Sequence, residues 1–179
     1  MKTGRIQLRL RELAQLFNSM DPSPFLDRDL DADAEEFIMS WAREHPKDHE
    51  LELTIHLATP PPEDRAASIE EAVHHYFAMR SQMKQHEFQQ LMRRGWRSLI
   101  IGLSFLTGCL FLGEFASRLG PGTGANIVRE GLTIMGWVAM WRPLEIYLYT
   151  WWPVRDEQKL LARLTRMRVH LVLPADTKP

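Results

Sequence analysis

The 179-residue sequence has a single cysteine, Cys109, and lacks the familiar catalytic motifs. One cysteine excludes an internal disulfide and a cysteine-based zinc cluster. There is no P-loop, no G-x-S-x-G nucleophile turn and no H-E-x-x-H zinc motif, so no nucleophile can be matched with a base. The sequence therefore favours a protein that is not an enzyme, and it predicts no catalytic residue and no cofactor.

An excess of charge of either sign is also missing. The 22 lysines and arginines nearly balance the 23 aspartates and glutamates, which leaves a net charge of −1. Without a global positive field, we expect no nucleic-acid partner. The first residues, MKTGRIQLRLREL, contain no apolar segment, so we also expect no cleavable signal peptide.

What the sequence does have is two long apolar runs, at about residues 98–119 and 131–152. An α-helix needs roughly 20 residues to cross a hydrocarbon core of about 30 Å, and both runs are long enough. A buried helical pair in a soluble protein is the alternative interpretation. Arginines and lysines flank the outer ends of the two runs rather than the segment between them, which predicts a multi-pass protein in the lipid bilayer with both termini cytoplasmic.

Three short stretches alternate apolar and polar residues: Arg5–Arg11, Leu51–Leu57 and Met167–Leu173. Such alternation is typical of strands with one buried face. Because a two-stranded sheet is marginal by itself, we expect the third strand to return to the first two. The predicted fold class is an α+β cytoplasmic domain, a small three-stranded sheet with helices, joined to a two-helix transmembrane hairpin.

These patterns predict the following division of the chain. Residues 1–95 form the cytoplasmic α+β domain, residues 96–154 form the transmembrane hairpin, and residues 155–179 form a cytoplasmic helix and strand that return to the N-terminal domain. One helix has its apolar stripe at Ala34, Phe37, Ile38 and Trp41. A second helix starts near Ser68 and meets no strong stop signal, so it is expected to continue into the first span as a rod of about 50 residues.

A proline-containing loop precedes the first of these helices, and it is the first candidate interaction site. Alternate aspartates there are reminiscent of a calcium loop, but Ala32 and Ile38 stand where an EF-hand needs glycine and glutamate. We therefore predict no metal site, and we interpret the acidic residues as helix caps and ion-pair partners. The loop interaction candidates are Asn18, Asp21, Phe25, Arg28 and Asp29.

Charged residues inside the apolar runs are the second candidate group. Glu114, Arg142 and Glu145 would be costly if they faced lipid, so they should face protein, each other or water. Arg142 and Glu145 have i, i+3 spacing and can pair on one helix. An ion pair that fixes the hairpin or an oligomer seam is favoured over an ion path, because two helices cannot enclose a path without assembling.

Two phrases, FNSMDPSPF at Phe17–Phe25 and GWVAMWRPLE at Gly136–Glu145, are distinctive. With them, most of the chain resembles an uncharacterised family of small bacterial membrane proteins with two transmembrane helices. The resemblance implies a protein of the bacterial inner membrane with a cytoplasmic domain. It implies no activity, cofactor or catalytic residue.

The leading functional hypothesis is a non-enzymatic, membrane-anchored interaction or assembly module that associates with itself. Its expected partners are the lipid bilayer and a second copy or another membrane protein. The small residues Ser104 and Gly108, four apart, would allow close helix approach. The alternative is a subunit of a membrane enzyme or transporter whose site lies around Asn18–Asp33 or the group Glu114, Arg142 and Glu145.

Overall fold

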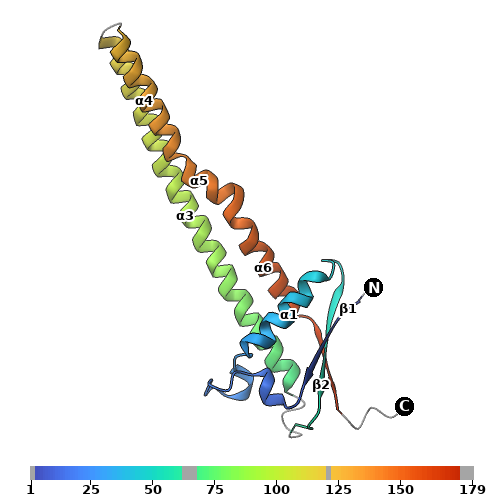
Figure 1. Cartoon of the computed structure of the whole chain (residues 1–179). Helices are drawn as coiled ribbons and strands as arrows, with labels where there is room; N and C mark the ends of the chain where they lie inside the picture. The colour runs from blue at the N-terminus through green and yellow to red at the C-terminus, as the bar shows by residue number, and fades with distance from the viewer. Residues whose placement is uncertain (1–2, 62–67, 120–121, 174–179) are drawn as a thin grey trace. The chain divides into compact units, whose positions relative to one another are not determined.

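A computed structural model describes residues 3–61, 68–119 and 122–173 of the chain (Figure 1). The chain forms two compact units, which are described separately. Unit 1 consists of residues 1–84 and 156–179, and unit 2 consists of residues 85–155.

Unit 1 contains a three-stranded sheet in the order β1 (Thr3–Leu10), β2 (Glu50–Leu57) and β3 (Arg168–Val172). The prediction of a small three-stranded sheet with helices is confirmed, and β3 pairs with β2 although unit 2 lies between them in the sequence. Both pairings are parallel. The register sets Arg5 opposite Glu52, and Glu52 opposite Arg168.

The hydrophobic core of unit 1 lies on one face of this sheet. Alternate residues of β1 and β2 point into it, and Ile6, Leu53 and Ile55 are completely buried. Three helices supply the opposing side chains: α1 (Ala32–Glu44), the first turns of α3 (Ile69–Leu119) and the last turns of α6 (Trp151–Leu164). Burial of such side chains contributes roughly 1.5–3 kcal/mol each, which is the main stabilisation of this unit.

Helix α1 does not bury its whole expected apolar stripe. Ala34 and Ile38 are buried, but Phe37 and Trp41 are 36% and 43% exposed. Met39 and Ala42 fill the inner face instead. The helix is therefore rotated relative to the expected stripe, and two aromatic side chains are left on its flank.

The other face of the sheet carries polar side chains, among them Arg5, Glu52 and His170. Glu52 lies 3.7 Å from Arg5 Nε and 3.6 Å from His170 Nε2. Parallel sheets usually have both faces covered, so a polar face of this kind is uncommon.

In unit 2, α3 continues without a break to Leu119, so the expected long rod is confirmed at 51 residues. Helix α4 (Thr123–Ala139) runs back alongside α3 (Figure 1). Glycines allow this close approach, since a Cβ atom on Gly136 would lie 2.7 Å from Leu106 Cδ1 and one on Gly102 would lie 3.0 Å from the Ala139 carbonyl oxygen.

The second expected span, about 131–152, is not one continuous helix. Helix α4 starts eight residues earlier and ends at Ala139, and it is followed by α5 (Trp141–Glu145), the π-helix η3 (Ile146–Thr150) and α6. Pro143 explains the interruption, because it has no N–H to donate to the preceding turn. The wider π turn that follows lets Thr150 Oγ1 donate to the Glu145 carbonyl at 3.2 Å.

Within the described residues, one helix is long and apolar enough to cross a membrane, the helix that covers Ile69–Arg118. Its most apolar 18-residue window has a mean hydropathy of 1.9, and 17% of that window is buried. A core helix of a soluble protein would be mostly buried, so this apolar segment differs from one.

Candidate functional site

The loop between η1 (Leu13–Leu16) and α1 brings together several of the sequence-predicted interaction residues. Phe17 and Leu30 form an antiparallel bridge that closes the loop. The Asn18 N–H donates to the Asp29 carbonyl at 2.8 Å, and the Asp31 N–H donates to the Leu16 carbonyl at 2.9 Å. Main-chain hydrogen bonds thus hold the two ends of the segment 16–31 together.

Asp21 organises the interior of this loop. Its Oδ2 accepts the Asp29 N–H at 2.8 Å, and its Oδ1 accepts the Ser23 N–H at 2.9 Å. The hydrogen bonds from Asp29 and then from Ser23 favour the ionised carboxylate, and they lower the pKa of Asp21 from 3.8 to about 2. The Asp21 carboxylate therefore accepts hydrogen bonds from main-chain N–H groups and stabilises the loop.

Phe25 and Arg28 lie on the other side of the loop. The ring of Phe25 is half-buried against the core, and its centroid lies 4.9 Å from that of Phe17. Arg28 Nη2 donates to the Ser23 carbonyl at 3.4 Å, and both Phe25 and Arg28 line a small hollow of about 220 Å³. Phe25 thus packs partly on the core and partly lines this hollow.

Two acidic residues near the end of this loop contact the helices of unit 1. Asp31 caps α1, because its Oδ1 accepts the Asp33 N–H at 3.0 Å. Asp27 Oδ1 lies 3.3 Å from His75 Nε2 on α3. Among the residues that the structure describes, no group of three or more His, Cys, Asp or Glu side chains is placed to hold a metal ion.

The three charged candidates of unit 2 belong to two separate local ion pairs. Arg142 Nη1 lies 3.1 Å from Glu145 Oε2, which is the i, i+3 pair expected from the sequence. Glu114 pairs at 3.3 Å with Arg118, one turn further along α3. In the described part of the chain, Glu114 and Arg142 therefore do not share an ion pair.

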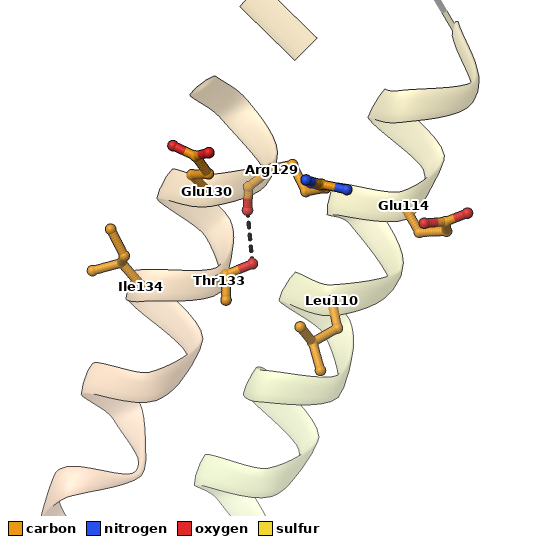
Figure 2. Close-up of a pocket in the computed structure, with 6 residues that line it drawn as sticks. All are labelled: Leu110, Glu114, Arg129, Glu130, Thr133 and Ile134. Carbon is orange, nitrogen blue, oxygen red and sulfur yellow. Dashed lines mark hydrogen bonds between the residues drawn. The ribbon is translucent and has the colours of Figure 1, made fainter. Parts of the chain in front are cut away.

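Figure 2 shows that Glu114 points away from α4 at the rim of an open groove between α3 and α4. The groove has a volume of about 680 Å³, and Arg129, Glu130 and Thr133 of α4 contribute its other polar groups. Thr133 Oγ1 donates to the Arg129 carbonyl at 2.8 Å. Arg129 and Glu130 lie between the two apolar runs of the sequence, and the early start of α4 at Thr123 makes them part of this helix.

A polar cluster in unit 1 was not among the sequence-predicted site residues. Glu35 of α1 accepts hydrogen bonds from Tyr76 Oη at 2.8 Å and from Arg80 Nε at 3.0 Å. Burial and the hydrogen bond to Glu35 raise the pKa of Tyr76 above its ordinary range. Burial of Arg80 opposes its charge, but the hydrogen bond and charge of Glu35 outweigh that effect and raise its pKa. The cluster joins two helices of unit 1.

A sequence signal for this cluster was present. Arg80 is a polar residue at a position of the otherwise apolar inner face of its helix, and such a residue needs an acidic partner.

Comparison of the chain with protein-family models, with curated proteins and with solved structures gave no match. The side chains described above cap helices, form ion pairs and line surface grooves. A proposal for the function therefore rests on the exposed surfaces of the two units.

Proposed function

We propose that the chain is a membrane-anchored interaction module that associates with copies of itself, with unit 2 in the bilayer. The observation that carries the proposal is the apolar surface of unit 2. On α3, large apolar side chains that are exposed include Ile100, Ile101, Leu103, Phe105, Leu110, Phe111, Leu112 and Phe115. On α4 they include Ile127, Val128, Ile134, Met135, Trp137 and Val138. Apolar area of this extent calls for lipid or a protein partner.

Two crossings of the bilayer are part of the proposal. The apolar half of α3 makes the first, and α4 with α5 makes the second over Thr123–Glu145. Helix α4 has 17 residues, which rise about 26 Å and fall short of a hydrocarbon core of about 30 Å. The second crossing therefore needs α5 in addition to α4.

The proposed orientation places both termini on the cytoplasmic side of a bacterial inner membrane. It is supported by arginines at the outer ends of the apolar segments, Arg93, Arg94 and Arg97 before the first and Arg155 after the second. Trp151 lies beneath Arg155, whose Cζ is 5.5 Å from the ring centroid, and tryptophan favours the membrane interface. The family resemblance of the sequence supports the same location.

Single-cysteine labelling tests the topology. In a Cys109→Ala background, a cysteine is introduced at Asn126 at the start of α4, or at Ser40 on α1 as the matched control. We expect a membrane-impermeant maleimide to label Asn126→Cys in intact spheroplasts and Ser40→Cys only after lysis. Labelling of both positions before lysis, or of Ser40→Cys alone, would contradict the proposal.

Self-association is supported by a second small-residue face on α3. Gly102 and Gly113 face the returning chain, where a Cβ would lie 3.0–3.1 Å from atoms of Ala139 and Arg129. Gly108 points elsewhere, and nothing lies within 4 Å of its would-be Cβ. Ser104, one turn earlier, is also exposed. This open face permits close approach of a second α3.

The mass of the full chain in lipid nanodiscs or mild detergent tests this step. Gly108→Leu should shift the protein from oligomer to monomer, since the added side chain blocks close approach. Gly131→Leu is the matched control, because Gly131 is an exposed helix glycine with nothing within 4 Å. A wild-type protein that is strictly monomeric, or an equal response to both substitutions, would argue against self-association through α3.

A further inference from the structure

The outer edge of β1 is unpaired within the described part of the chain, because β1 is an edge strand whose only strand partner there is β2. The Leu10 carbonyl accepts the Ala58 N–H at 3.0 Å, so the main chain of Leu10 faces β2. In a strand the main-chain groups alternate in direction, so those of Arg5, Gln7 and Arg9 face outward. The Arg5 carbonyl lies 3.4 Å from His45 Nε2, so the main-chain groups of Gln7 and Arg9 are the ones that this edge presents to a partner strand.

A groove of about 670 Å³ runs along this edge. Arg5, Gln7 and Arg9 line one side, while Leu8 and the two exposed aromatics of α1, Phe37 and Trp41, provide its apolar wall. The two aromatic rings lie together, with centroids 6.0 Å apart. The groove therefore combines the outward main-chain groups of Gln7 and Arg9, an apolar wall and a charged rim.

Both charged residues that line the groove are arginines. Arg5 has a side chain that is 71% exposed, and its contact with Glu52 is a long one at 3.7 Å. Arg9 forms no ion pair with any residue that the structure describes. The positive charge at the rim is thus available to an incoming anionic group.

We propose that this groove binds an extended acidic peptide segment of another protein, which adds to the sheet as a strand beside β1. Side chains of an added strand alternate between the two faces of the sheet. Acidic residues at positions one and five would lie opposite Arg5 and Arg9, and apolar residues at positions two and four would contact Leu8, Phe37 and Trp41. The recognised pattern is acidic–apolar–any–apolar–acidic.

A second copy of the chain fits the groove less well. If two β1 strands paired antiparallel about Gln7, Arg5 of each copy would lie opposite Arg9 of the other. Like charges directly opposite one another destabilise a strand pair. Parallel pairing of two β1 strands would not close into a symmetric dimer. Charge complementarity therefore selects an acidic partner, and this inference concerns unit 1 alone, so it does not depend on the membrane proposal.

Fluorescence anisotropy with the full chain in zwitterionic nanodiscs tests the inference. The probe is labelled acetyl-GEVTVEG-amide, and the control peptide is acetyl-GKVTVKG-amide. We expect the acidic peptide to bind and the basic one not to bind. Arg9→Glu should weaken binding about tenfold or more, whereas Arg168→Glu on β3 makes the same charge change at the opposite edge of the sheet and should leave it nearly unchanged.

Two further measurements examine the mode of binding. On addition of the acidic peptide, amide hydrogen exchange of wild-type Gln7 and Arg9 should slow, because their N–H groups gain acceptors. Gln7→Pro removes one outward donor while leaving the ladder to β2 intact, and it should abolish binding.

Several results would overturn the inference. Equal losses in Arg9→Glu and Arg168→Glu would indicate nonspecific attraction, and unchanged exchange at Gln7 and Arg9 would exclude strand addition. A single-stranded oligonucleotide that displaces the peptide from the groove would identify a different partner class. A change of oligomeric mass in Arg9→Glu without any peptide binding would assign the groove to a second copy.

Discussion

Glu35 in α1 and Arg80 in α3 form a two-point contact, with Arg80 Nε donating to Oε1 at 3.0 Å and Nη2 to Oε2 at 3.2 Å. Tyr76 donates to the same carboxylate, so one acidic side chain satisfies donors on two turns of α3. The Glu35 side chain is only 18% exposed. Paired charges of this kind tie α1 to the start of α3 in a defined register.

The first prediction follows from this contact. Glu35→Ala leaves Arg80 and the Tyr76 hydroxyl without their acceptor, and we expect it to lower the free energy of unfolding of unit 1 by about 1–2 kcal/mol. Glu36→Ala removes the same charge from an exposed position on the same helix and should change little. Thermal unfolding of the full chain in detergent compares them, and equal melting temperatures would refute a stabilising role for the pair.

The second prediction concerns pH and the loop around Asp21. The folded state lowers the pKa of this carboxyl from 3.8 to about 2. Its contribution to the stability of the loop is therefore complete above pH 3.8 and is lost as the pH falls through about 2. We expect amide exchange of Asp29 and Ser23 to accelerate over that range relative to the intrinsic acid dependence. Asp21→Asn should loosen both amides at neutral pH.

Asp48→Asn provides the matched control for the loop, since Asp48 is exposed in the turn before β2. It should leave both amides unchanged. If Asp21→Asn preserves their protection, the carboxylate does not hold the loop.

The third prediction addresses the packing of α3 against α4. A methyl group on Gly136 would meet Leu106 Cδ1 at 2.7 Å and Leu106 Cα at 3.3 Å, so Gly136→Ala requires the Leu106 side chain to change its position and the two helix backbones to separate slightly. We expect a loss of about 1–3 kcal/mol in the stability of unit 2. Gly131→Ala, which meets nothing within 4 Å, should be neutral or slightly stabilising because alanine favours helix. Protease resistance of unit 2 in detergent reports the difference.

The fourth prediction concerns β3. Deletion of residues 167–179 removes a whole strand from beside β2 together with the buried Met167, which is 1% exposed. Amide exchange of Leu53 and Ile55 should accelerate, while membrane insertion should be unaffected. The control deletion of 174–179 retains the strand and should behave as wild type. Unchanged exchange in the longer deletion would show that β3 does not support the sheet.

Much of unit 1 was predictable because strand alternation and burial are local properties of the sequence. Leu53 and Ile55 face the core as their spacing required, and β3 joined the sheet because its apolar residues needed a partner. The parallel direction of all three strands was not predictable from these patterns. It depends on how α1 and α6 connect the strands, which is a tertiary property.

Other differences have identifiable physical causes. The hydropathy pattern did not predict that α4 starts at Thr123, because Arg129 and Glu130 interrupt the apolar run. Both residues nevertheless favour helix. Periodicity gave α1 an apolar stripe that included Phe37 and Trp41, but it could not fix the rotation of the helix to within one residue. The role of Asp21 could be anticipated only as a tendency, since aspartate before proline favours turns in which its side chain binds the main chain.

The position of β3 in the sequence has a consequence for biosynthesis. The ribosome makes β1 and β2 first, then all of unit 2, and only afterwards the strand that completes the sheet. Until then, the edge of β2 that β3 will occupy is open, and the nascent domain is vulnerable to wrong pairing. Completion of the sheet thus waits for the helical segment. In the proposed membrane topology, a chain that leaves β3 on the opposite side of the bilayer from β2 cannot complete the sheet. The strand order couples correct placement of the helices to the maturation of the sheet.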